Sequence, residues 1–289
     1  MGDGPALERL LRRDRLVTAV GLAVLCGLAW AYILTGAGLG LSAWAMTRLS
    51  LFPHLAASPQ AAMPGMDRPG MDMGAMNARP AAWSASAWIL TVAMWWTMMV
   101  AMMTPSAAPT ILLYGRVHRQ AATRGWSGSG LAPAWAFAAG YLLVWLGFSV
   151  AAAGLHWSLE RSGLLSAALM GSQSKWLSGA VLIGAGLYQL SPPHDVCLSH
   201  CRAPADFLSR HWRPGLTGAI RLGALHAAFC VGCCWLLMAL LFVGGVMNLA
   251  WIAALTLMVV AEKLVPGGRW VARLGGLALL SWGLATFLI

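Results

Sequence analysis

One apolar stretch of the sequence carries four side chains that can bind soft metals or take part in redox chemistry. His226, Cys230, Cys233 and Cys234 form the pattern His-x-x-x-Cys-x-x-Cys-Cys. Positions i, i+4, i+7 and i+8 share one face of an α-helix, so three thiols and an imidazole would lie together. Burying such a polar stripe in an apolar helix is unfavourable unless a partner satisfies it. The spacing therefore predicts a site for a thiophilic metal ion.

A second group of soft ligands lies in the segment 42–83, which is rich in Met, Pro and Gly. Its methionines are Met63, Met66, Met71, Met73 and Met76. Pro and Gly oppose a regular helix, so we expect an external loop that exposes its thioethers to water. Thioethers suit Cu(I), and their close spacing predicts capture of this ion. A plain linker that is enriched in Met by chance is the alternative.

Three further methionines recur every four residues in the apolar stretch that follows. Met94, Met98 and Met102 share one helical face. At a rise of ~1.5 Å per residue, Met98 reaches a depth similar to that of Cys230 in an antiparallel helix. We therefore expect this face to supply thioethers to the cysteines. Met is also an ordinary filler of packed helices, and that alternative stays open.

Two prolines interrupt the same stretch, at Pro105 and Pro109. Each removes a helical hydrogen bond and pushes away the carbonyl four residues earlier. Freed backbone groups within a bilayer must face protein or a wet cavity. The pattern predicts a discontinuous helix beside an ion site, with a simple kink as the alternative.

The segment 192–216 carries a separate set of possible ligands. Cys197 and Cys201 are four residues apart, and His194 and His200 lie three residues to either side of Cys197. Thiols and imidazoles at such spacings bind Zn²⁺ or Cu(I). We expect a cytoplasmic loop with an acceptor or donor site, the alternative being two free surface thiols.

The composition indicates that these possible ligands belong to a membrane protein. The 289 residues are 59% hydrophobic and only 10% charged, which lies outside the range of soluble domains. The seven apolar stretches are 16–38, 84–113, 132–157, 175–191, 217–243, 246–262 and 270–289. We predict an all-α bundle of about seven spans in a lipid bilayer, forming a single domain over 1–289.

The distribution of positive charge predicts the orientation of the bundle. Of the 19 Lys and Arg residues, 14 lie in the N-terminal segment and in the second, fourth and sixth loops. Such residues accumulate on the cytoplasmic side, so we expect a cytoplasmic N-terminus and an external C-terminus in a bacterial inner membrane. Because the basic residues are scattered between apolar stretches, the net charge of +10 does not indicate nucleic acid binding. The orientation depends on a reversal at Gly244–Gly245.

Three blocks of the sequence, 95–109, 188–204 and 230–263, together resemble a known bacterial family. Its members are described as predicted metal-binding integral membrane proteins of unknown function. The resemblance runs from about residue 88 to residue 265. It implies a polytopic membrane protein with a metal site, and it implies no substrate.

The sequence as a whole predicts a membrane protein that handles Cu(I). Metal captured by the external loop would pass to Met98, Met102, Cys230, Cys233 and Cys234, with His226 as a further ligand. A periplasmic copper protein or cuproenzyme is the expected partner, and Zn²⁺ is the other possible metal. No catalytic residue is predicted. Two alternatives stay open, namely a thiol–disulfide oxidoreductase that uses Cys230 and Cys233 and an assembly subunit of a membrane complex.

Overall fold

The structure, a computed structural model, describes residues 4–37, 47, 83–123, 132–167 and 170–288. Every regular element in these residues is a helix, so the predicted all-α fold is confirmed. The five methionines at 63–76 lie outside the described residues. The helices are α1 (Gly4–Leu34), α3 (Ala85–Thr123), α4 (Ala132–Arg161), α5 (Lys175–Gln189), α6 (Pro192–Arg202), α7 (Pro204–His211), α8 (Gly215–Ala239), α9 (Leu241–Gly244), α10 (Leu249–Leu264) and α11 (Gly268–Leu288).

Each of the seven predicted apolar spans coincides with one main helix. Five helices, namely α1, α3, α4, α8 and α11, are long and apolar enough to cross a membrane. The other two, α5 and α10, are apolar but have 15 and 16 residues. At ~1.5 Å per residue they extend about 22–24 Å, less than the hydrocarbon thickness of a typical bilayer. The number of spans and their orientation therefore stay predictions.

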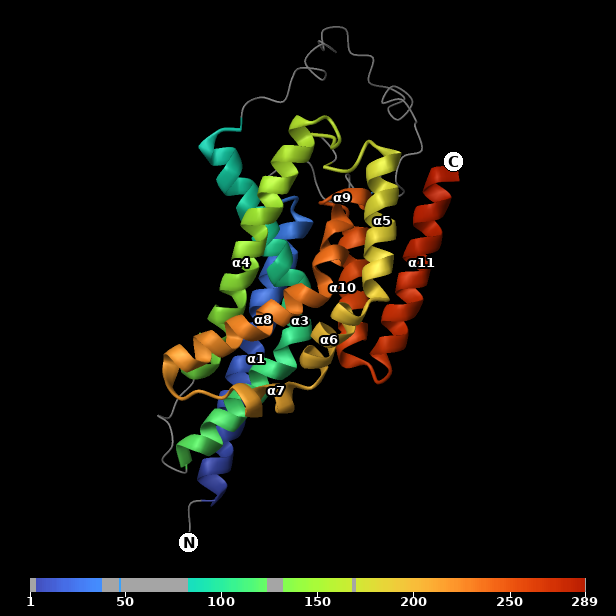
Figure 1. The fold of residues 1–289 in the computed structure, drawn as a ribbon. Coiled ribbons are helices and arrows are strands. Elements are labelled where there is room, and N and C mark those ends of the chain that lie inside the picture. Colours follow the sequence, from blue (N-terminus) through green and yellow to red (C-terminus); the bar gives the residue numbers. More distant parts are fainter. Residues whose placement is uncertain (1–3, 38–46, 48–82, 124–131, 168–169, 289) are drawn as a thin grey trace.

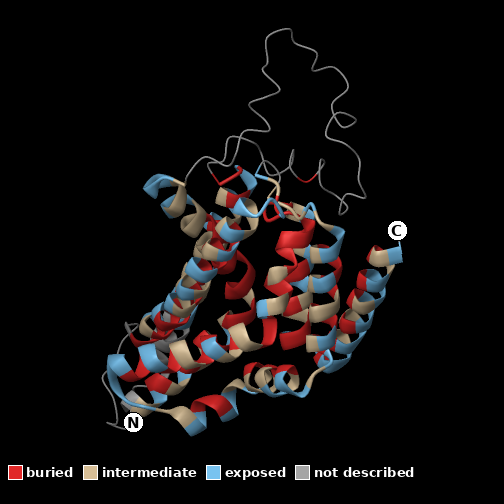
Figure 2. Ribbon diagram, turned by 45° about the horizontal axis from the view of Figure 1, so that its top comes forward, coloured by how far each residue is buried: buried red, intermediate tan, exposed pale blue. Residues whose placement is uncertain are grey.

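The helices form two groups that meet along α8 and α10 (Figure 1). In one group, α1 packs on α3, α3 on α4, and α4 on α8. In the other, α5 packs on α11 and α11 on α10, while α10 also contacts α3. The start of α1 and the end of α11 lie at opposite ends of the bundle in Figure 1. This arrangement places α8 in the interior. In its most apolar segment 61% of the residues are buried, compared with 22% in the corresponding segments of α1 and α11 (Figure 2).

The contact between α4 and α8 depends on two glycines. A Cβ atom on Gly140 of α4 would collide with the backbone carbonyl of Ile220, and one on Gly223 of α8 would collide with that of Phe137. Small residues let helix backbones approach closely, which strengthens van der Waals packing where hydrophobic transfer offers no driving force. The two glycines thus hold α8 against α4 just before its cysteines.

The predicted break at Pro105 and Pro109 is wrong, because α3 continues through both prolines from Ala85 to Thr123. Pro105 has no N–H group to donate to the carbonyl of Ala101. That carbonyl instead accepts from the thiol of Cys26 in α1 at 3.5 Å. A donor from a neighbouring helix satisfies the backbone group that the proline frees, so the helix need not open to water.

The segment 192–216 is folded for most of its length, as α6 and α7. Each of these helices has a proline in its first turn, Pro192 and Pro204, where the missing N–H has no helical partner to lose. α6 packs against α8 and α10, which brings its polar residues to the interior of the bundle.

The reversal expected at Gly244–Gly245 is present. The short helix α9 ends there, and Gly245 adopts a φ of 91°, a left-handed conformation that glycine takes without strain. Asn248 then caps α10, accepting from the N–H groups of Ala250 at 3.0 Å and Trp251 at 3.4 Å. The chain therefore turns directly from α8 and α9 into α10, which returns along the bundle.

Candidate metal centre

The middle of α8 carries three cysteines that are all buried in the bundle. Cys230, Cys233 and Cys234 are each 1% exposed, and none forms a disulfide. The thiols of Cys233 and Cys234 donate to the carbonyl of Cys230, at 3.1 and 2.8 Å respectively. The Cys230 thiol interacts with both of these side chains. One turn of α8, the most buried of the five long apolar helices, therefore gathers three soft ligands.

The cysteines of α6 join these thiols and do not form a separate site on the surface. Cys201 is 8% exposed and interacts with Cys230 and Cys233. Cys197 lies against α8, where a Cβ atom on Gly232 would come within 2.7 Å of its Sγ atom. Burial, together with nearby Cys233, raises the pKa of Cys197. The thiols of segment 192–216 therefore lie beside those of α8, and the acceptor or donor role expected of them stays a prediction.

The helix α3 contributes a thioether to the same cluster. The Sδ atom of Met103 lies 3.8 Å from the Sγ atom of Cys234. Met94, Met98 and Met102, which the sequence singled out, are each at most 1% exposed and lie in the hydrophobic core. The thioether that reaches the cysteines is thus that of Met103, which the four-residue spacing did not single out.

Two polar side chains hold the Cys230 thiol from other helices. Lys263 of α10 donates to Cys230 Sγ with a distance of 2.9 Å, and its Nζ atom also lies 3.5 Å from Ser106 Oγ. Tyr141 of α4 places its hydroxyl 3.0 Å from the same sulfur. Lys263 is 6% exposed and Tyr141 only 1%. An ammonium group in such an apolar interior needs a partner able to carry negative charge, and the cysteine sulfur is that partner.

His226, one turn before Cys230, lies beside the cluster among aromatic rings. Its ring centroid lies 5.3 Å from that of Phe207, 5.9 Å from that of Tyr141 and 6.1 Å from that of Phe137. The side chain is 2% exposed, and its Nδ1 atom has no hydrogen-bond partner among the described residues. His226 is thus an available nitrogen ligand at the edge of the sulfur cluster.

A second buried polar group lies next to the cluster, around Glu262. Gln189 of α5 donates to the Glu262 carboxylate at 2.6 Å, and His194 of α6 lies 3.9 Å from it. Burial lowers the pKa of His194. Arg202 donates to the backbone carbonyls of Glu262 and Val265, which satisfies the C-terminal end of α10. Glu262 therefore faces α5 and α6, whereas the next residue, Lys263, faces α8.

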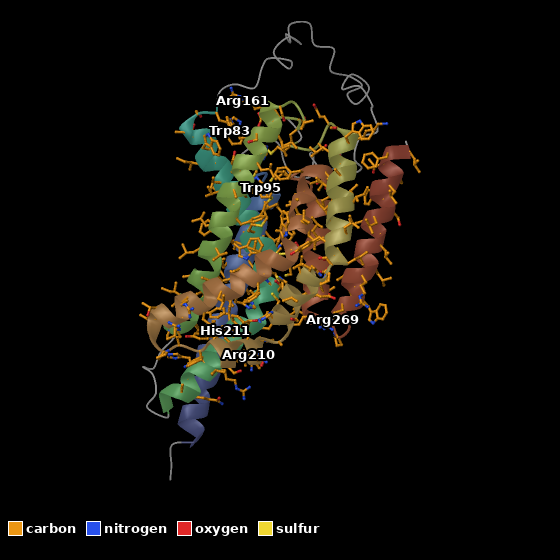
Figure 3. All side chains as sticks on the ribbon, viewed as in Figure 1. Trp83, Trp95, Arg161, Arg210, His211 and Arg269 are labelled. Atoms are coloured by element: carbon orange, nitrogen blue, oxygen red, sulfur yellow. The ribbon has the colours of Figure 1, made fainter. Side chains whose placement is uncertain are left out.

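Polar and aromatic groups also mark the two ends of the bundle (Figure 3). At one end, His156 of α4 is 2% exposed, with its Nδ1 atom 3.5 Å from Trp95 Nε1 and its Nε2 atom 4.0 Å from Glu160. Figure 3 places Trp83 and Arg161 near this end, and Arg210 and Arg269 near the other.

The cluster contains soft ligands but is not closed around one point in space. Within the part of the chain that the structure describes, no group of three or more His, Cys, Asp or Glu side chains meets the geometry of a metal site. The Cys230 sulfur also contacts two groups that are not metal ligands of this kind, the ammonium of Lys263 and the hydroxyl of Tyr141.

Four features of this cluster were not predicted from the sequence, namely Lys263, Tyr141, the thioether of Met103 and the place of Cys201. Lys263 and Tyr141 come from helices distant in sequence, and no local pattern connects them to Cys230. Cys201 was singled out, but for a separate loop site. The prolines that begin α6 and α7 were a usable signal that segment 192–216 is helical.

Comparison with known proteins adds one match. A family model described as PpoB2, copper chaperone, matches residues 92–286. No curated protein and no solved structure matches the chain. The matched region begins within α3 and extends into α11, so it contains the whole thiol cluster, Met103 and Lys263.

Proposed function

The chain belongs to the PpoB2 copper chaperone family, and on this premise we propose that it carries Cu(I) as cargo on the thiol cluster. The thiolate ligands would be Cys230 and Cys234, with the thioether of Met103 as a weaker third ligand and Cys201 beside them as a neutral thiol. The observation that carries the proposal is the contact of these side chains from α8, α6 and α3 in one buried place.

The chemistry of the ligands favours copper in its reduced form. Thiolates and thioethers are soft donors, which select Cu(I) over hard cations that prefer oxygen. Zn²⁺ also binds thiolates but favours four ligands in a tetrahedron. Burial of all three α8 cysteines at 1% exposure restricts access of water and oxidants, which suits an oxidisable cargo.

We also place this cargo site within a membrane. Five helices are long and apolar enough to cross a bilayer, and the shorter α5 and α10 pack among them. The opposite positions of the α1 start and the α11 end fit an odd number of crossings. The excess of Lys and Arg on one side supports a cytoplasmic N-terminus in a bacterial inner membrane.

The chaperone role would begin at the external methionines, Met63, Met66, Met71, Met73 and Met76. Thioethers on such a loop would raise the local concentration of weak, exchangeable ligands for arriving copper. The ion would pass to the stronger thiols and then to an acceptor such as a periplasmic copper protein or cuproenzyme. Met94, Met98 and Met102 lie in α3 before Met103 and would serve as intermediate thioethers.

The test is the metal content of protein purified in detergent without oxygen. We expect close to one copper per chain and free thiols. Cys230→Ser and Cys234→Ser should each lower the copper content, because the serine oxygen is a hard ligand. The matched control is Cys26→Ser, since its hydroxyl can still donate to the Ala101 carbonyl and the residue lies outside the cluster.

Two results would replace this proposal. Metal-free protein with an oxidised Cys230–Cys233 pair would favour the thiol–disulfide oxidoreductase. Full copper occupancy in both serine variants, with normal folding, would show that the ion binds elsewhere in the chain.

A further inference from the structure

Lys263 is an unusual neighbour for a copper site because it brings a positive charge into a cluster of metal ligands. Its Nζ atom lies 2.9 Å from Cys230 Sγ and 3.5 Å from Ser106 Oγ, and the side chain is 6% exposed. The carboxylate of the adjacent Glu262 instead accepts from Gln189. Lys263 therefore directs its charge at the thiols.

We propose that Lys263 determines which metal the thiol cluster accepts, by setting the net charge of the buried site to match a monovalent ion. This inference rests on the proposed function, since it assumes that Cys230 and Cys234 hold the cargo. It adds a role for Lys263 as the residue that selects Cu(I) over a divalent ion such as Zn²⁺.

The argument is a count of charges in a medium of low dielectric constant. Metal-bound cysteines are thiolates, so two of them together with the ammonium of Lys263 carry one net negative charge. A monovalent ion such as Cu(I) makes this group neutral. A divalent ion leaves one positive charge without a partner, and an uncompensated buried charge is strongly unfavourable.

The direction of this effect does not depend on other ionisable groups nearby. Glu262 interacts with Gln189 and His194, and these groups remain whichever side chain occupies position 263. Removal of the positive charge of Lys263 therefore favours binding of the divalent ion over the monovalent one, whatever the charge of the group around Glu262. Tyr141, the other polar contact of Cys230, is likewise unchanged.

The experiment is a competition between Cu(I) and Zn²⁺ for the full-length protein in detergent, without oxygen, with bound metals measured by mass spectrometry. Lys263→Gln removes the charge and should lower the ratio of bound copper to bound zinc by about tenfold or more, given the short distance between the charges. Lys263→Arg retains the charge and should keep a ratio close to that of the wild type.

A second variant offsets the positive charge of the site while Lys263 itself is retained. Ser106→Asp puts a carboxylate beside the ammonium, because Ser106 already lies 3.5 Å from Nζ. It should lower the copper-to-zinc ratio as Lys263→Gln does, so the test holds even if one variant fails to fold. Ser106→Ala removes the same hydroxyl without adding charge, and should leave the ratio unchanged.

Each result separates the inference from the function on which it rests. Wild-type protein that binds no Cu(I) overturns the proposed function. Wild-type protein that binds Cu(I), with an unchanged ratio in Lys263→Gln and Ser106→Asp, overturns the role of Lys263 alone. An equal change of the copper-to-zinc ratio in Lys263→Gln and Lys263→Arg would also overturn the role of Lys263, because the shape of the side chain and not its charge would then determine the ratio.

Discussion

The Nζ atom of Lys263 lies 2.9 Å from the Sγ atom of Cys230, and the contact joins α10 to α8 in the interior of the bundle. Ser106 on α3 and Tyr141 on α4 complete the polar surroundings of these two groups. Four helices therefore meet around this pair of side chains. A buried network of this kind specifies a single arrangement of helices when all its members have partners.

The first prediction concerns the thioether that reaches the cysteines. Met103→Leu should weaken Cu(I) binding, by up to about tenfold, because leucine fills similar space but offers no soft ligand. Met98→Leu, in the same helix and equally buried, should have a smaller effect. Competition with a Cu(I) chelator measures both. A larger loss of Cu(I) affinity in Met98→Leu would mean that the site lies on the face that contains Met94, Met98 and Met102.

The second prediction concerns the close contact of α4 and α8. Gly223→Ala would force a Cβ atom onto the Phe137 carbonyl, and overpacking of this kind costs about 1–3 kcal/mol. We expect a lower unfolding temperature in detergent, with a loss of copper at the cluster about two to three turns away.

The matched control for this prediction is Gly154→Ala in α4. Nothing lies within 4 Å of a Cβ atom at that position, and alanine is the better helix former. Its unfolding temperature should equal or slightly exceed that of the wild type. If the two variants unfold at the same temperature, the backbones of α4 and α8 are not in the contact described.

The third prediction concerns topology. A reporter fused after Ile289 should be active only outside the cytoplasm, and one inserted next to Arg119 only inside it, because 14 of the 19 Lys and Arg residues lie in segments that the proposed topology assigns to the cytoplasmic side. Activity of both fusions in the same compartment would mean that α5 or α10, the two short helices, does not cross.

The fourth prediction concerns the five methionines between residues 63 and 76. Deletion of residues 63–76 should reduce copper loading when external copper is limiting, and matter little when copper is abundant, because weak thioether ligands would act by raising the local concentration of binding groups. Replacing the five methionines with leucine, at unchanged loop length, controls for the shorter connection. Equal loading at limiting copper would leave the segment with the role of a linker.

The helices could be predicted from the sequence, since long apolar stretches allow little else. Each predicted span coincides with a helix, and the reversal near Gly245 follows from glycine and the capping residue Asn248. The helices of segment 192–216 were harder to predict, because they are short and polar. Their first-turn prolines were the available signal.

The polar contacts of the cluster could not be predicted in the same way. Periodicity shows which residues of one helix share a face, but not which residue of another helix lies opposite. Lys263 and Glu262 are adjacent in sequence and look like an ion pair, yet they face α8 and α5. Likewise, the bond from Cys26 to Ala101 joins residues whose relation appears only in the folded bundle.

The most direct test of copper binding by the thiol cluster is X-ray absorption at the copper edge of protein loaded with Cu(I). The account predicts a first coordination shell made only of sulfur, which loses sulfur in Cys230→Ser and in Cys234→Ser but not in Cys26→Ser. A shell dominated by nitrogen or oxygen, or one that is unchanged in both cluster variants, would contradict it.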